Sequence, residues 1–247
     1  MPAWILKQAT DFYWQKGSKP MGMKNRILLR VSLAATMVLC GLPAMALQPF
    51  TAQYDASYKG IPANGVMLLV PQGNRWTYSV VINNSMAKLS QSTVFSETGN
   101  GFRPLGSSDR SQYLTKTKSV VSHYDWKNLQ ARWTGDIKPS RSGPVKMQNG
   151  DMDALLVNLA LTRDATTGRP MNYRLVENGR IKPLQYRVIG KENMTVAGKP
   201  VLATKVAQSS GNKQTIVWIA PGIPTPLRIV QREDGSESFR LQLKSWR

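Results

Sequence analysis

The chain has 247 residues, and its 33 Lys and Arg residues against 14 Asp and Glu residues give a formal net charge of +19. It contains a single histidine, which excludes a histidine metal cluster, and with so few acids and no clustered ligand motif we predict no metal and no cofactor. The charge favours either an anionic partner or a dispersed, solvated surface.

The first predicted element is a secretory signal peptide. Basic residues precede an apolar run over residues 31–42, and Ala44-Met45-Ala46 closes this run. That order is the layout of a leader that is cleaved after an Ala-x-Ala site, here after Ala46. The run is shorter than the roughly 20 residues that span a membrane, and the alternative is a buried core helix.

We expect the signal peptide to cover residues 21–46 and residues 1–20 to be an over-long gene start, because Met21 and Met23 offer later starts. Lipidation at Cys40 is not expected, since Leu39 stands where a small residue is required. Cleavage leaves residues 47–247 as a single β-rich domain without cysteine, hence without disulfides.

The export signal directs the partner prediction towards the periplasm. The mature chain keeps 27 basic residues against 13 acids, a formal balance of +14. In that compartment an anionic lipid or another anionic envelope component, or a protein partner, is favoured over nucleic acid. No transmembrane segment is expected after cleavage of the leader.

Alternation of apolar and polar residues predicts strands through most of the mature chain. The clearest alternating runs cover residues 54–59, 76–82, 184–188 and 239–244. Turn sequences Asn178-Gly179, Ala197-Gly198 and Asp234-Gly235 predict hairpins, so the C-terminal half is expected to be an antiparallel meander.

One segment has the spacing of a helix instead. Met152, Leu155, Leu156 and Leu159 follow the i, i+3, i+4, i+7 pattern, which predicts an amphipathic helix over about 151–163. Asn149 or Asp151 is expected to cap it, with Asp153 in its first turn. A catalytic carboxylate pair of Asp151 and Asp153 is disfavoured, because residues two apart on a helix point to different sides.

Candidate catalytic residues centre on His123. It shares a strand face with Asp125, and Ser122 or Ser119 is a conceivable nucleophile, which gives a metal-independent hydrolase as an alternative function. A surface or structural role is favoured for His123, because no nucleophile-elbow motif supports a triad. Basic residues beside tryptophans, as in Trp126-Lys127, Arg132-Trp133 and Arg75-Trp76, are a nucleic-acid signal, but a β core with basic residues on its opposite face is the favoured explanation.

Most of the mature chain resembles an exported bacterial family called domain of unknown function 3108, and the similarity is clearest in the C-terminal half. The similarity lies in "PLQYRVIGKENMTVAGKPVLATKVAQ" and "TIVWIAPGIPTPLRIVQREDGSESFRLQLKSW". The matching residues are Tyr186, Val188, Gly190, Glu192, Gly198, Ala203, Lys205, Val206, Trp218, Ala220, Pro226, Arg228 and Ile229. The resemblance implies a β-rich envelope protein and brings no catalytic residues and no cofactor.

The expected fold is mainly β: an antiparallel, strongly curved sheet or incomplete barrel with one helix packed against it. Three functions remain open. The first is a non-enzymatic periplasmic protein that binds a lipid-like or anionic envelope molecule or a protein partner. The second is the hydrolase that uses His123, and the third is a polyanion-binding module. A deep apolar cavity, the surroundings of His123 and the distribution of Lys and Arg discriminate among them.

Overall fold

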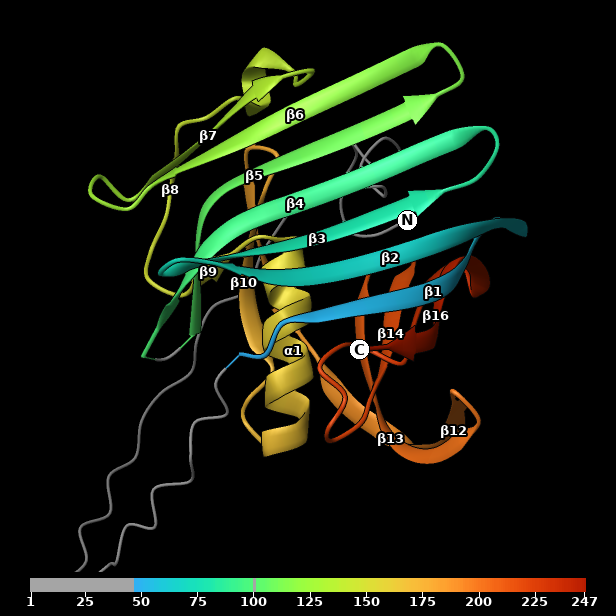
Figure 1. Ribbon diagram of the computed structural model, residues 1–247. Coiled ribbons are helices and arrows are strands. Elements are labelled where there is room, and N and C mark those ends of the chain that lie inside the picture. Colours follow the sequence, from blue (N-terminus) through green and yellow to red (C-terminus); the bar gives the residue numbers. More distant parts are fainter. Residues whose placement is uncertain (1–46, 100) are drawn as a thin grey trace, which may run out of the picture.

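A computed structural model describes residues 47–99 and 101–247 (Figure 1). The N-terminal strands are β1 (Phe50–Tyr58), β2 (Ile61–Gln72), β3 (Arg75–Asn83), β4 (Ala87–Thr98), β5 (Gly101–Tyr113), β6 (Lys116–Asp125), β7 (Gln130–Gly135) and β8 (Val145–Lys146), with a 3-10 turn at Pro139–Arg141. The middle elements are β9 (Asp151–Met152), α1 (Ala154–Thr167), β10 (Asn172–Glu177) and β11 (Arg180–Gln185). The C-terminal strands are β12 (Arg187–Val196), β13 (Lys199–Ser210), β14 (Lys213–Ile219), β15 (Arg228–Glu233) and β16 (Ser236–Trp246).

Thirteen of these strands form one antiparallel, strongly curved sheet that does not close into a barrel (Figure 1). Its order is β12-β13-β14-β15-β16-β1-β2-β3-β4-β5-β6-β7-β8. The first and last strands of the domain pair at its centre, where Ala56 lies opposite Leu241. The prediction of a mainly β, curved antiparallel sheet is therefore confirmed, as are the three hairpin turns named from the sequence.

The helix and a second, three-stranded sheet lie against the concave side of the large sheet. In this small sheet β9 pairs in parallel with β10, and β10 pairs antiparallel with β11. Most residues of α1 are buried, because the helix is enclosed by the large sheet on one side and by β10 on the other. This arrangement explains why its apolar residues are not confined to one narrow stripe.

The predicted helix boundaries, about 151–163, are wrong at both ends. Asp151 and Met152 belong to β9, and the helix continues to Thr167 before Gly168 ends it with a φ of 71°. The cap is Asp153, whose carboxylate accepts a hydrogen bond from the Leu156 amide at 3.0 Å, and not Asn149 or Asp151. Asp151 is instead fully buried and accepts a 2.7 Å hydrogen bond from Arg174 of β10, which fixes residue 151 in the small sheet.

The core follows the alternation of the strands. Inward-facing residues of the large sheet, such as Tyr54, Leu69 and Phe95, join the buried face of α1 in one cluster. The Tyr54 hydroxyl lies 2.6 Å from the Thr225 hydroxyl and donates to the Pro226 carbonyl at 2.8 Å, so its burial leaves no polar atom unsatisfied. No helix in residues 47–99 and 101–247 has the length and apolar character needed to cross a membrane.

Candidate functional site: a cavity beneath the helix

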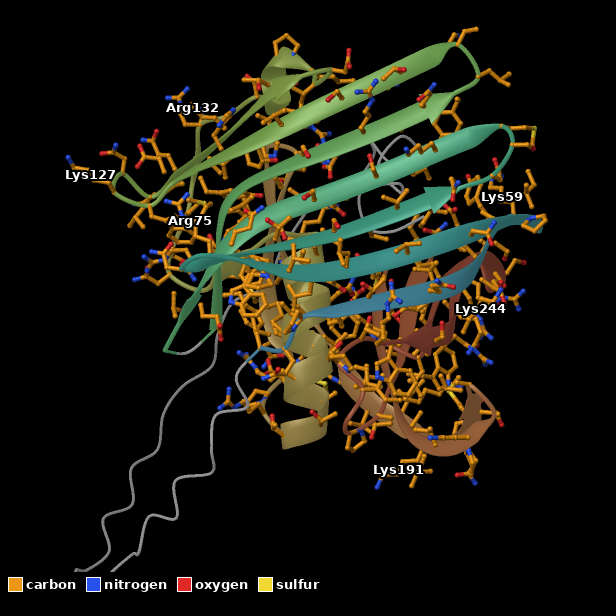
Figure 2. The ribbon with its side chains drawn as sticks, viewed as in Figure 1. Lys59, Arg75, Lys127, Arg132, Lys191 and Lys244 are labelled. Atoms are coloured by element: carbon orange, nitrogen blue, oxygen red, sulfur yellow. The ribbon has the colours of Figure 1, made fainter. Side chains whose placement is uncertain are left out.

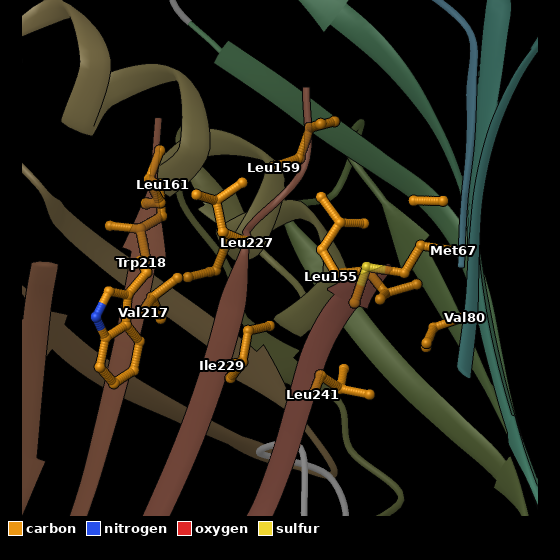
Figure 3. Packing of buried hydrophobic residues seen from close by; sticks show 14 of the residues in the cluster. Met67, Val80, Leu155, Leu159, Leu161, Val217, Trp218, Leu227, Ile229 and Leu241 are labelled. Carbon is orange, nitrogen blue, oxygen red and sulfur yellow. The ribbon is translucent and has the colours of Figure 1, made fainter. Parts of the chain in front are cut away.

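A cavity of about 60 Å³ lies between the concave face of the large sheet, α1 and the small sheet. Its lining consists of Met67, Val80, Gln91, Ala154, Leu155, Val157, Asn158, Leu175, Leu184, Tyr186, Thr215, Ile229, Gln231, Phe239 and Leu241. Figure 3 shows Met67, Leu155 and Leu241, from β2, α1 and β16, at this junction. The cavity is thus mainly apolar and bounded by elements from all three parts of the chain.

The strand registers explain why these side chains meet. Met67 lies opposite Val80, and Val80 lies opposite Gln91, so the three residues form one row across β2, β3 and β4 on the concave face. A second row runs through Ile229 of β15 and Leu241 of β16. The first turn of α1 lies across both rows, because Asp153 fixes where the helix begins.

Two buried glutamines contribute to the polar part of this mainly apolar cavity, together with Asn158, Tyr186 and Thr215. Gln91 and Gln231 are each only 4% exposed, and the Oε1 atom of each has no hydrogen-bond partner in the described part of the chain. A buried carbonyl without a donor costs about 1–3 kcal/mol of folding free energy. The Gln91 side chain also hydrogen-bonds Asp109 of β5, so Gln231 makes the clearer case for a molecule in the cavity that donates hydrogen bonds.

A polar cluster continues from Gln91 along the concave face. Asp109 of β5 lies opposite Gln91 in the register, and Asp153 accepts a 2.6 Å hydrogen bond from Thr93 of β4. Burial, with a contribution from the Glu177 and Asp153 charges, raises the pKa of Asp109 to about 8. Burial also raises the pKa of Asp153 to about 6, although hydrogen bonds from Thr93 and from the backbone partly oppose this shift. At neutral pH the carboxyl of Asp109 is therefore mostly protonated.

These shifts predict that the protein is less stable in alkaline solution. The unfolded chain releases the Asp109 proton near pH 3.8 and the folded chain near pH 8, so the free energy of unfolding should fall as pH rises between these values. Asp153 also lowers the free energy of unfolding as pH rises, but only up to about pH 6. The decline between pH 6 and 8 is therefore due to Asp109.

We expect Asp109→Asn to reduce the decline in the free energy of unfolding between pH 6 and 8. At pH 9 this variant should be more stable than the unaltered protein. Urea unfolding at several pH values measures this. Asp55→Asn, at an exposed position of β1, is the control and should leave the decline unchanged. An identical slope in Asp109→Asn and the unaltered protein would contradict the prediction.

The candidate hydrolase residues are not brought together. His123 is exposed on β6, whereas Ser122 is buried and points to the opposite face of the same strand. The Asp125 carboxylate accepts hydrogen bonds from the backbone and side-chain nitrogens of Asn128, at 3.0 and 2.7 Å. A His123, Asp125 and Ser122 triad is therefore not assembled. Ser119 is on the strand face of His123 but four residues away, two alternations along the strand.

The tryptophans beside basic residues have structural partners within the chain. Trp126 donates to the Pro104 carbonyl at 2.6 Å with Arg103 over its ring, and Trp133 is buried in a smaller cluster with Tyr124. Basic side chains labelled in Figure 2, among them Arg75 and Lys191, lie far apart around the molecule. The labelled basic side chains are therefore not gathered on one face of the molecule.

Sequence reasoning missed Gln91 and Gln231 as site residues. Gln231 could have been identified from the sequence, because it lies two residues after Ile229 and therefore faces the same side of the strand as this buried apolar residue. Gln91 had none, since its segment "KLSQSTVF" carries polar residues on both faces of the strand. Its burial results from α1, more than sixty positions further along the chain.

The comparisons with known proteins identify a family and no activity. The family described as "Protein of unknown function (DUF3108)" matches residues 53–244. No curated protein matches the chain. Among solved structures, the Pseudomonas aeruginosa MucA/MucB complex is 10% identical with a TM-score of 0.38, and the match covers 81% of this chain and 51% of that one. The structure of PNGF-II is 13% identical with a TM-score of 0.29, over 81% and 28%. The chain thus spans about half of the first of these two solved chains and less than a third of the second.

Proposed function

The chain belongs to the DUF3108 family, whose function is unknown, and we propose that it is a non-enzymatic envelope protein that holds a lipid-like molecule in the cavity beneath α1. The observation that carries this proposal is the pair of buried glutamine Oε1 atoms that lack a hydrogen-bond partner in the described residues, in a mainly apolar lining that also includes Asn158, Tyr186 and Thr215. Ligand sites commonly combine apolar walls with a few convergent polar groups.

The size of the cavity limits what it holds in this conformation. About 60 Å³ accommodates roughly two water molecules, or the end of an alkyl chain beside a hydroxyl or amide group. A longer chain requires α1 and the small sheet to move away from the large sheet. The proposed ligand therefore has an apolar end and a hydrogen-bond donor that reaches Gln91 or Gln231.

The periplasm is the proposed compartment, and the leader pattern ending at Ala46 supports it. Expression of residues 21–247 in a Gram-negative host, followed by intact-mass measurement of the periplasmic fraction, tests both proposals. We expect a chain that begins at Leu47 and a small molecule that appears after organic extraction. An uncut chain that stays in the cytoplasm would contradict export alone.

The double variant Gln91→Leu/Gln231→Leu tests the cavity. Leucine fills similar space without a carbonyl, so we expect the free energy of unfolding to rise by about 2 kcal/mol, while the extractable molecule is lost. Urea unfolding and mass spectrometry of the extract measure the two effects. Gln53→Leu, at an exposed position of β1, is the matched control and should change neither.

Two results would contradict the proposed function. One is the same extracted mass from the double variant as from the unaltered protein. The other is an unaltered protein with no extractable molecule and a double variant with unchanged stability, which would mean that water satisfies both glutamines.

A further inference from the structure

Three hairpin turns lie side by side at one end of the strands in the N-terminal half of the large sheet. They join β1 to β2, β3 to β4 and β5 to β6, and all three are at the right of Figure 1. The Leu114 amide donates to the Met86 carbonyl at 3.1 Å, and the Asn84 side chain donates to the Pro62 carbonyl at 3.4 Å. These contacts make one continuous surface, which we call the apolar edge and define as residues 59–62, 84–86 and 113–116.

The apolar edge exposes large apolar side chains on every turn. Ile61 is 44% exposed, Met86 51%, Tyr113 44% and Leu114 76%. These are half of the large apolar residues that are exposed in the described chain, and the turns at the opposite ends of these strands contribute none. Exposed apolar residues gathered in this way mark an interaction surface.

Leu114 is the least expected of these residues. It has a φ of 48°, in the left-handed region that favours Gly or Asn, and it begins the two-residue turn between Tyr113 and Lys116. A leucine side chain that is 76% exposed gains little stabilisation from burial in the fold. Its presence is explained if the side chain is buried when the protein binds something else.

The charge around these turns has one sign. Residues 58–62, 83–88 and 112–118 contain Lys59, Lys88, Lys116 and Lys118, all exposed, and no acid. The neighbouring turn between β15 and β16 differs, because Asp234 lies in it and Glu233 and Glu237 lie in the adjoining strand ends. The lysines therefore complement a negatively charged partner at the apolar edge specifically.

We propose that the apolar edge docks onto an anionic lipid surface. Ile61, Met86 and Leu114 enter the boundary between head groups and acyl chains, while the lysines contact lipid phosphates. A lipid surface is favoured over a protein because the apolar side chains project from strand ends, in a row bordered by lysines, and do not cover a strand face. This inference does not depend on a ligand in the cavity.

A fluorophore attached to the turn between β5 and β6 reports membrane contact at that turn, independently of any membrane binding by the N-terminal segment. In the full chain with Cys40→Ser, Thr115→Cys is labelled with the environment-sensitive dye NBD. Asn74→Cys, in the β2–β3 turn at the opposite end of the strands, is the control position. We expect a blue shift at position 115 with vesicles that contain phosphatidylglycerol, little shift with phosphatidylcholine alone, and none at position 74. Equal responses at both positions, or none at position 115, would overturn the proposal.

Leu114→Asn separates docking from folding. Asparagine suits the left-handed conformation, so thermal stability should not fall, while the vesicle affinity of the dye-labelled protein should drop about tenfold. Leu202→Asn makes the same change at a residue that is 53% exposed on β13 and should leave the affinity unaltered. Lys116→Gln and Lys118→Gln should each lower the affinity about fivefold in low salt. Unchanged affinity in Leu114→Asn would refute the docking surface.

Discussion

Replacement of Asp153 by alanine is expected to lower the free energy of unfolding by about 3 kcal/mol. The Asp153 carboxylate caps α1 by accepting a hydrogen bond from the Leu156 amide, and it accepts a second one from the Thr93 hydroxyl. Both contacts are buried. Alanine removes a helix cap, worth about 1 kcal/mol, and leaves two buried donors without an acceptor. Urea unfolding at pH 7 measures the loss.

Asp153→Asn is the matched control for this loss. Its amide oxygen can still cap the helix and its size is unchanged, so we expect a decrease of about 1 kcal/mol or less. Since the pKa of Asp153 is raised to about 6, asparagine should also remove part of the stability decline between pH 4 and 6. If the alanine and asparagine variants were equally stable, capping by Asp153 would not position the helix.

Leu155→Ala is expected to lower the free energy of unfolding by about 3 kcal/mol. Leu155 is 2% exposed, lies in the first turn of α1 and lines the cavity, so truncation adds empty volume to a site already incompletely filled. The loss should appear as a lower urea midpoint with an unchanged slope.

Leu202→Ala provides the comparison, because Leu202 is exposed on β13 and its truncation should cost well under 1 kcal/mol. A loss for Leu155→Ala no larger than for Leu202→Ala would mean that the helix does not pack on the sheet as described. Addition of a short alkyl alcohol provides a second reading, since it should raise the midpoint of Leu155→Ala by filling the enlarged cavity.

Local patterns sufficed for the strands. Phe239, Leu241 and Leu243 alternate with polar residues, and all three are buried on one face of β16. The Asn178-Gly179 turn joins β10 to β11 as expected, because two consecutive left-handed residues match the twist of a hairpin. Such features depend on neighbours within a few positions.

The wrong and missing predictions concern segments whose structure is determined by residues far away in the sequence. Met152 fits the helical spacing, yet Arg174 and the parallel pairing with β10 hold Asp151 and Met152 in a strand. The burial of Gln91 depends in the same way on a helix formed much later in the chain. Alternation along one strand contains no information about such partners, so the cavity and its polar groups required the structure.

The pairing of β1 with β16 constrains the order in which the chain can complete its fold. The first and last of the described strands lie at the centre of the sheet, where Thr51 and Arg247 exchange backbone hydrogen bonds of 2.9 and 3.0 Å. Until the last strand arrives, β1 and β15 both present unpaired edges that can pair with other chains. A polypeptide that emerges N-terminus first must therefore be kept from self-association until β16 is available, and contacts between such distant segments make this pairing slow.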